Sequence, residues 1–407
     1  MISNLDKKIR AYSLKNAIAH EGKAQTGAVI SSLFHEGLKK EQVKDTIKQI
    51  NQTIKEINSI PLPAQIEEYE KLEKVVSERE ERHGLPEIPN TKKIITRFAP
   101  SPSGPLHIGH ASTGSLSALY VKKYKGKFYI RIEDTNPENI YIPAYKMISE
   151  ESKWLWGKNT KVIIQSDRMN LYYKYIKTLF NKNSIYVCTC DTEEFKKLIE
   201  NQKPCPCRKN TIKENLEQWS KMLSKDKKTQ FKEGEAVVRF KSNLKDPNPA
   251  LRDFPLARIN ESPHPRQKKK YRVWPLMNLA VAVDDIETKV THAIRASDHR
   301  DNSIRQMMIF QVLNKKAPWN AFVGRYNFTD LELSSTQMRK DIESGKYKSW
   351  SDPELPTIAS LRKQGYKPEA FWGLAVRSGL TEANKTLTKK EYFELLDYFN
   401  RQDKIEI

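Results

Sequence analysis

Long apolar runs are absent from this sequence of 407 residues. No run approaches the roughly 18–20 residues that a membrane span needs, and the N-terminus lacks the apolar core and cleavage site of a signal peptide. The sequence also lacks the GxxxxGKS/T and GxGxxG patterns, which excludes an ordinary P-loop or dinucleotide site. We therefore expect a cytoplasmic protein without a membrane segment.

Acidic residues are scarce relative to basic ones. The 50 Asp and Glu residues stand against 71 Lys and Arg residues, which gives a formal net charge of +21. Such a surplus favours a polyanionic partner such as nucleic acid, although a lysine-rich proteome would produce the same charge. The basic runs "RQKKKYR" (266–272) and "KDKK" (225–228) fall in one region of the chain, which favours a docking face there.

Cysteine is rare, and its four copies lie within twenty residues of one another. Cys188, Cys190, Cys205 and Cys207 form two CxC pairs. Disulfides are uncommon in a reducing compartment, whereas four thiolates can close a tetrahedron around Zn²⁺. Four protein ligands leave no position for a water or substrate, so we predict a structural zinc site. The alternative is four small buried hydrophobic side chains.

The first ninety residues predict a helical domain. Apolar residues of one segment alternate spacings of four and three, as on one face of a helix: Val43, Ile47, Ile50, Ile54 and Ile57. A second helix, which carries Ile66, Tyr69, Leu72 and Val76, is expected to end at Gly84. This region is either an appendage that binds RNA or another partner, or a plain packing domain.

The pattern changes after this region to short runs of β-branched and aromatic residues. The runs "KKIITRFA", "KFYIRIED" and "KVIIQSD" are separated by helical stretches, which predicts βαβ units and a parallel sheet. The fold class is therefore α/β. Ligands of such sheets lie beyond the carboxyl ends of the strands, which is where the next motif falls.

That motif is the turn "RFAPSPSGPLHIGHASTG", residues 97–114. Its prolines fix backbone dihedrals, while Gly104 and Gly109 let the backbone approach a ligand. His107 and His110 stand at the start of a helix, where the positive end of the helix dipole favours phosphate. The turn therefore predicts a phosphate-binding site.

Together, "HIGH" (107–110), "RFAPSPSG" and "RIEDT" (131–135) resemble the motifs of class I aminoacyl-tRNA synthetases. The stretches "GEAVVRFK", "NPALRDFPLARI", "AVDD", "VTHAIR" and "GKYKSWSDPELPTIASL" follow in the order of the archaeal-type glutamyl-tRNA synthetases, so the resemblance covers nearly the whole chain. It implies a Rossmann-type catalytic domain. It also implies that ATP, with Mg²⁺, activates glutamate, which then passes to the terminal ribose of tRNA.

The resemblance also implies which residues hold the substrates. His107 and His110 would hydrogen-bond the phosphates of ATP. Arg97 and Arg295 would bind substrate carboxylates, and Glu133 would accept the α-ammonium group. The pocket wall would be completed by Ala99, Ser101 and Met277. Taken singly, each arginine could instead be a surface charge and Glu133 part of a structural ion pair.

Two departures from the family pattern bear on activity. Met277 stands where the family has a tyrosine, beside Leu276 where a threonine is usual, so the pocket loses a hydroxyl group. In "LELSSTQMRK" Ser334 and Ser335 remain, but the expected lysine falls on Thr336 or Gln337. Catalytic roles would then pass to Ser334 with Arg339 or Lys340. Either the changes are tolerated, or the protein is a paralogue with another substrate or reduced activity.

The resemblance further implies a domain order, and the sequence stops near the point where the family begins its anticodon-binding β-barrels. We therefore expect tRNA to bind through its acceptor arm. The alternatives are a truncated paralogue that charges another amino acid or another acceptor, such as a tRNA base, a catalytically weakened tRNA-binding protein, and one half of a complex whose protein partner supplies the β-barrels for anticodon recognition. The expected domains are a helical domain (1–90), the first catalytic half (91–170), a zinc-containing acceptor-binding insertion (171–275), the second catalytic half (276–330) and stem-contact helices (331–407).

Overall fold

The computed structural model describes residues 4–76, 84–402 and 404–407. The chain forms two compact units, Met1–Glu81 and Arg82–Ile407. Within the described ranges, no helix combines the length and the apolar character needed to cross a membrane.

The first unit is helical, as predicted. It contains α1 (Leu5–Ala19), α2 (Thr26–His35), α3 (Val43–Ile57) and α4 (Leu62–Leu72). The expected apolar face of α3 packs into the core of the unit through Ile50, Ile54 and Ile57.

The prediction that the second helix reaches Gly84 is wrong. Helix α4 ends at Leu72 and tightens into a 3₁₀ turn, and Val76 then takes an extended conformation and enters the core. Tertiary packing overrides the helical pattern here, because Val76 buries its side chain in the core of the unit from an extended backbone. The rest of the predicted helix, 77–83, lies outside the described residues.

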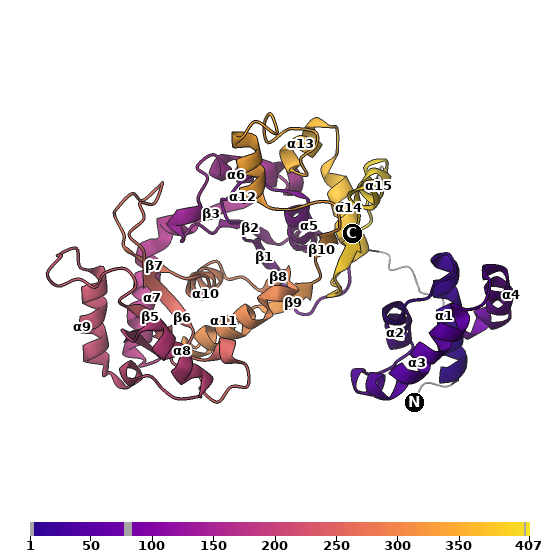
Figure 1. Ribbon diagram of the computed structural model, residues 1–407. Helices are drawn as coiled ribbons and strands as arrows, with labels where there is room; N and C mark the ends of the chain where they lie inside the picture. Colours follow the sequence, from indigo (N-terminus) through magenta and orange to yellow (C-terminus); the bar gives the residue numbers. More distant parts are fainter. Residues whose placement is uncertain (1–3, 77–83, 403) are drawn as a thin grey trace. The chain divides into compact units, whose positions relative to one another are not determined.

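The second unit is built on a parallel sheet, which confirms the predicted βαβ pattern (Figure 1). Strand β1 (Ile95–Phe98) leads through α5 (Ile108–Lys123) to β2 (Lys127–Ile132), and α6 (Ala144–Trp156) leads to β3 (Lys161–Ile164). The register pairs Ile95 with Lys127 and Tyr129 with Lys161.

Two further parallel strands, β8 (His292–Ala296) and β9 (Trp319–Val323), lie on the other side of β1. The backbone N–H of Thr291 donates to the carbonyl of Ile95 at 2.9 Å, which aligns β8 with β1. Helices α10 (Met277–Glu287) and α11 (Arg300–Val312) flank β8 in the chain. The carboxyl ends of β1, β2 and β8 therefore meet at one edge of the sheet.

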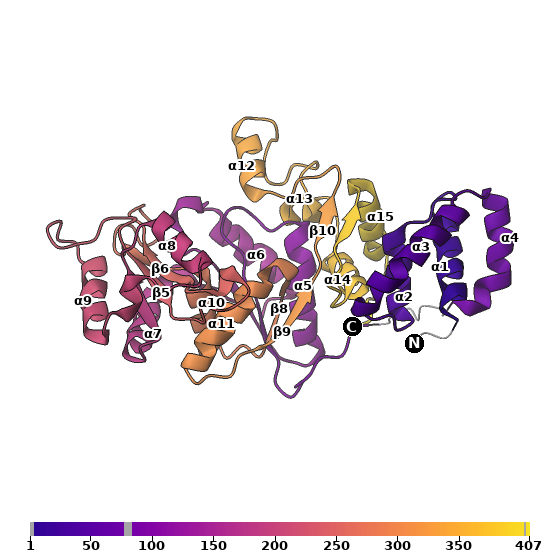
Figure 2. The same cartoon turned by 60° about the horizontal axis from the view of Figure 1, so that its bottom comes forward.

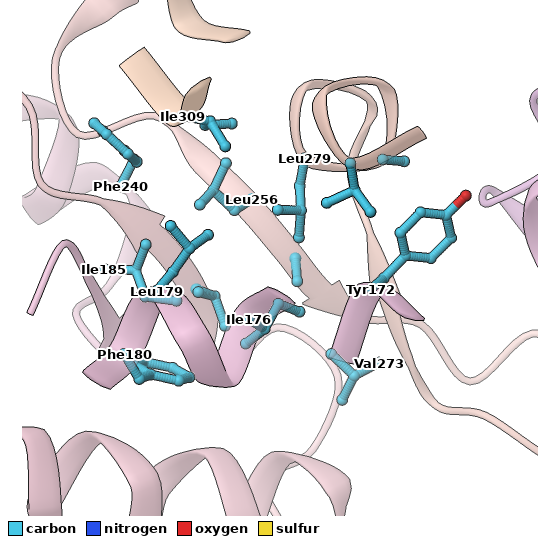
Figure 3. Close-up of a cluster of buried hydrophobic side chains, with 14 of the residues drawn as sticks. Tyr172, Ile176, Leu179, Phe180, Ile185, Phe240, Leu256, Val273, Leu279 and Ile309 are labelled. Carbon is cyan, nitrogen blue, oxygen red and sulfur yellow. The ribbon is translucent and has the colours of Figure 1, made fainter. Parts of the chain in front are cut away.

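Between β3 and β8 the chain forms a separate antiparallel sheet. Its strands, in order, are β4 (Ile185–Cys188), β5 (Val237–Phe240), β6 (Pro255–Ile259) and β7 (Val273–Pro275). Helix α7 (Met169–Asn181) packs against this sheet together with α10 and α11, through a cluster that includes Tyr172, Leu256 and Leu279 (Figure 3). Helices α8 (Thr192–Glu200) and α9 (Ile212–Leu223) complete the region.

The last part of the chain packs back on the parallel sheet. It comprises β10 (Tyr326–Phe328), α12 (Ser335–Glu343), α13 (Ile358–Lys363), α14 (Pro368–Ser378), β11 (Lys385–Leu387) and α15 (Lys389–Asn400). Helix α14 lies along α5 in Figure 1 and Figure 2, and the contact is apolar, with Leu119, Tyr120 and Ala375 buried. This packing fixes α5, whose first residues belong to the candidate site.

Candidate active site

A cavity of about 660 Å³ opens at the carboxyl ends of β1, β2 and β8. This is the position expected for a ligand of a parallel α/β sheet. Eight of the residues predicted from the sequence line it: Arg97, Ala99, Ser101, His107, His110, Glu133, Met277 and Arg295.

The two histidines belong to the first turn of α5. His107 is the N-cap residue, and its Nδ1 accepts a hydrogen bond from the N–H of Gly109 at 3.2 Å. His110 Nδ1 accepts from the N–H of His107 at 3.4 Å, and the two rings stack with centroids 3.7 Å apart. Because both Nδ1 atoms accept, the proton of each neutral imidazole lies on Nε2.

Burial keeps both rings neutral. It lowers the pKa of His110 to about 4. Burial, with a smaller contribution from His110, holds the pKa of His107 well below its usual value. At neutral pH the pair therefore offers two Nε2–H donors at the positive end of a helix, which suits the oxygens of a phosphate.

Arg97 on β1 and Arg295 on β8 are both buried, with 5% and 8% of their surface exposed. Arg295 donates from Nη1 to Ser303 Oγ at 2.8 Å and to Gln306 Oε1 at 3.0 Å, both uncharged acceptors. Among the described residues, Arg97 Nε has no hydrogen-bond partner. Burial, and then the neighbouring Arg97, lower the pKa of Arg295 to about 9. The pair therefore carries positive charge that the surrounding protein only partly compensates.

A third arginine, Arg131 on β2, supports this pair. It lies between Asp285 and Glu133 and donates hydrogen bonds to both carboxylates. Burial would raise the pKa of Asp285, but Arg131 and Arg97 outweigh it and keep the pKa below its usual value. Asp285 thus stays ionised between Arg131 and Arg97, whose Nε lies 3.5 Å from its Oδ1.

Glu133 follows β2 and faces the cavity with 20% of its side chain exposed. Burial raises its pKa, against the opposing effect of Arg131. The alternative of a structural ion pair therefore holds in part, because Arg131 binds this carboxylate. The exposed part of the side chain leaves room for a second cation from the cavity.

Met277 is the first residue of α10 and lines the cavity with 36% of its surface exposed. Leu276 caps the same helix through its backbone position alone and makes no side-chain capping bond. The part of the cavity wall that Met277 forms is therefore apolar.

The loop residues predicted to act on phosphate are not brought to the cavity. Ser334 caps α12 by accepting from the N–H of Gln337 at 3.2 Å, and Gln337 donates to Asp341. Arg339 lies near the ring of Tyr141 and 3.8 Å from Glu343, and Lys340 is exposed. None of Ser334, Arg339 and Lys340 is among the lining residues, whereas the preceding Leu331, Glu332 and Leu333 are.

One expected role in the turn is wrong. Gly104 does not approach the cavity: a Cβ atom there would lie 2.9 Å from Ser335 Cβ and 3.1 Å from the ring of Trp350. Its small size lets the turn pack against α12. Gly109, in contrast, lines the cavity as expected.

The sequence reasoning missed the residues that support the site. Arg131 and Asp285 fall in motifs that carried the resemblance but were given no role. Each is a charge inside an apolar run, a strand and a helix respectively, which is a signal for a buried ion pair. Glu151 on α6 was also missed: an oxygen of its buried carboxyl group accepts from the N–H of Leu106 at 2.7 Å and holds the turn from the side away from the cavity.

The four cysteines lie together, away from this cavity. Their Sγ atoms are all within 4.8 Å of one another. The pairs Cys188–Cys205 and Cys190–Cys207 are 3.8 and 3.7 Å apart. Zn–S bonds of about 2.3 Å in a tetrahedron require S–S separations of about 3.8 Å, so the residues present fit a zinc ion.

The cavity lies in a part of the chain that matches a known family. Residues 93–403 match the model described as tRNA synthetases class I (E and Q), catalytic domain. The chain belongs to this family of class I tRNA synthetases. The predicted resemblance is thereby confirmed, as is the mixed α/β catalytic domain with helical parts.

Relatives of this synthetase are found in archaea. The glutamate–tRNA ligase of Thermococcus onnurineus is 40% identical over 401 residues, which are 95% of this chain and 68% of that protein. That of Pyrococcus abyssi is 42% identical over 391 residues, 93% of this chain and 67% of that protein. The glutamate–tRNA synthetase structure from Elizabethkingia anophelis has a TM-score of 0.52 at 20% identity and covers 75% of this chain and 70% of that one. That likeness supports the fold.

Proposed function

We propose that the protein activates glutamate with ATP and transfers it to tRNA. One observation carries this proposal: two buried arginines, Arg97 and Arg295, face one cavity with positive charge that the protein does not fully compensate. Glutamate brings two carboxylates, and a planar guanidinium binds a carboxylate with two parallel hydrogen bonds. The amino acid would therefore complete the charge balance of its own site.

The remaining cavity residues complete the amino acid site. The exposed side of the Glu133 carboxylate would accept hydrogen bonds from the α-ammonium group of the amino acid, while Arg131 holds the Glu133 carboxylate in place. Ala99 and Ser101, which follow β1, would form the wall. Asp285 would keep Arg97 oriented through its charge.

The histidines would hold ATP. In the first step, a carboxylate oxygen of glutamate attacks the α-phosphorus, an acyl–phosphate bond forms, and the bond to pyrophosphate breaks. His107 and His110 would donate from Nε2 to phosphate oxygens, where such bonds strengthen as charge develops in the transition state. Mg²⁺ would enter with the nucleotide and balance its charge.

In the second step, a hydroxyl of the terminal ribose of tRNA attacks the activated carbonyl. The ester bond forms, AMP leaves, and the hydroxyl proton is released. No protein group has to form a covalent bond in either step, so the residues act by position and charge.

We further propose that the antiparallel sheet and its helices receive the acceptor arm of tRNA. Cys188, Cys190, Cys205 and Cys207 would hold a structural zinc ion, since four thiolates leave no open coordination position. The ion would fix the end of β4 to the segment around residues 205–207. The helices of residues 331–407 would contact the stem of the same tRNA.

A pyrophosphate-exchange assay with each of the twenty amino acids, with and without tRNA, tests the proposed function. We expect exchange with glutamate above all others. Exchange with a different amino acid would reassign the substrate. No exchange, together with tight tRNA binding, would reduce the protein to a tRNA-binding role.

A further inference from the structure

A second cavity, of about 570 Å³, lies at the opposite edge of the parallel sheet. Its walls come from the loops that precede β1, β8 and β9, so it sits at the amino ends of the strands whose carboxyl ends hold the active site. Five lysines line it: Lys92, Lys93, Lys289, Lys315 and Lys316. The proposed reaction uses none of them.

The charge of these lysines is not neutralised nearby. All five are exposed, and none forms an ion pair with a carboxylate in the part of the chain that the structure describes. Among the described residues that line the cavity, Asp285 alone is acidic, and it is buried and hydrogen-bonded to Arg131, which lines the active-site cavity. The cavity therefore concentrates positive charge.

The loops that carry the lysines are held in place. Asn90, Lys289 and Asn314 have positive φ values of 57°, 58° and 52°, so each loop turns sharply. The carbonyl of Thr291 accepts from the N–H of Trp319 at 2.9 Å, and His292 Nε2 donates to the carbonyl of Pro89 at 2.8 Å. These bonds tie all three loops to one another, which fixes the lysine backbones before any ligand arrives.

An ordinary structural role explains only part of the cluster. Lys289 follows α10, and Lys315 and Lys316 follow α11, so these three complement the negative ends of helix dipoles. Lys92 and Lys93 precede a strand and have no such role. Mutual repulsion of five ammonium groups around one cavity also opposes the arrangement unless an anion enters it.

The charge distribution favours RNA as that anion. Residues 1–81 contain 13 Lys and Arg and 13 Asp and Glu, so the whole surplus of +21 lies in residues 82–407. Lysines on flexible stems contact phosphates as point charges without reading bases. The partly exposed ring of Trp319 adds an aromatic surface, and this combination is typical of a groove that follows a nucleic-acid backbone.

We propose that this lysine-lined cavity binds the phosphate backbone of RNA, at a place separate from the active site. The inference rests on the proposed function in one respect, which is the choice of a tRNA as the RNA for the binding test. Contacts of this kind add affinity that depends strongly on salt and little on sequence.

The test replaces the five lysines with glutamine and compares a matched control. The control carries five Lys→Gln changes at exposed lysines of α1, α3 and the turn after α1, which also have no ion pair among the described residues and lie in the unit whose charge is balanced: Lys15, Lys23, Lys44, Lys48 and Lys55. Binding of a labelled tRNA transcript is measured by fluorescence anisotropy from 50 to 300 mM salt. Each phosphate contact contributes about −0.9 to the slope of log K against log salt. We therefore expect the magnitude of this negative slope to fall by roughly 3 in the cavity variant and by less than 1 in the control.

Two outcomes would overturn the proposal: equal slopes for both variants, or no change from the parent in either. Thermal melting of both variants confirms that the fold is kept. Charging at saturating tRNA should be unchanged in the cavity variant, because the cavity lies apart from the reacting groups. If the parent binds tRNA but charges nothing, the proposed function fails while the RNA site is still tested by the slopes.

Discussion

At the scale of single residues, the site depends on two neutral imidazoles. His107 and His110 each accept a backbone hydrogen bond at Nδ1 and therefore present Nε2–H groups. If these donors act on ATP, His107→Ala and His110→Ala should each slow adenylate formation by roughly 10²–10³-fold, as is typical for a lost transition-state donor. Pyrophosphate exchange measures this step. Exchange rates equal to those of the parent would show that the turn is only structural.

The low pKa values of these two histidines predict how activity depends on pH. Because burial lowers the pKa of His110 to about 4, the ring remains neutral from pH 5.5 upward, whereas an ordinary histidine would titrate near 6.5. We expect kcat/KM for ATP to show no histidine titration between pH 5.5 and 7.5, with the Ala variants as the reference for any other ionising group. A break near pH 6.5 that disappears in His110→Ala would contradict the account.

Met277 decides the character of one cavity wall. If glutamate is the substrate, Met277→Tyr should raise kcat/KM for glutamate by about 3- to 10-fold, since a new hydrogen bond contributes about 0.5–1.5 kcal/mol. Met277→Leu keeps the wall apolar and is the control, with a change below about 2-fold. A fall in activity with Tyr would instead indicate a cavity rebuilt for a more apolar amino acid.

At the scale of elements, the turn between β1 and α5 is held from two sides. The N–H of Ile108 donates to the carbonyl of Pro356, and the N–H of Ile358 donates to the carbonyl of Leu106. From the other side, Glu151 accepts from the N–H of Leu106. Burial raises the pKa of Glu151 to about 8, against the opposing effect of that N–H donor.

This carboxyl group makes stability depend on pH. Between pH 4.5 and 8 the folded state binds the proton of Glu151 and the unfolded state does not. The stability that this proton contributes is therefore fully present below pH 4.5 and is lost as the pH rises through 8. Glu151→Gln, which keeps an acceptor without a charge, should therefore be stabilised relative to the parent at pH 9 and not at pH 5. Thermal melting of both proteins at the two pH values measures this. A difference that does not depend on pH would contradict the raised pKa.

The cysteine cluster belongs to this scale as well. We expect one equivalent of zinc per chain. Cys188→Ser or Cys205→Ser should lose the metal and destabilise the antiparallel sheet, while the affinity for ATP changes less. Thr192→Ser, at the start of α8, is the control and should keep the zinc. Elemental analysis of freshly purified, reduced protein that finds no metal would reject the site.

The elements divide into those that local pattern predicts and those that it does not. Strands β1 to β3 and helix α3 were predicted because alternation and helical spacing act within a few residues. The antiparallel sheet was not, since β4 pairs with β5 across nearly fifty residues. The site shows the same division: His107 and Arg97 lie in readable motifs, whereas the roles of Glu151 and Asp285 depend on contacts made only after folding.

At the scale of the whole molecule, the two edges of one sheet carry different chemistry. The carboxyl edge gathers buried arginines and neutral histidines around a cavity, and the amino edge gathers exposed lysines. Because residues 1–81 are balanced in charge and the surplus lies in the second unit, we expect the surfaces that bind a polyanion on the second unit. The alternative of a protein partner for anticodon recognition stays a prediction.

The central claim is that this chain joins glutamate to the terminal ribose of tRNA. The most direct test uses labelled glutamate, ATP and a tRNA transcript without modified bases, half of which has its terminal ribose oxidised by periodate. We predict acid-precipitable label on the intact transcript and none on the oxidised one, with Arg295→Gln as the inactive reference. Equal labelling of both transcripts would place the acceptor elsewhere on the tRNA, and no labelling of the intact transcript would contradict the claim.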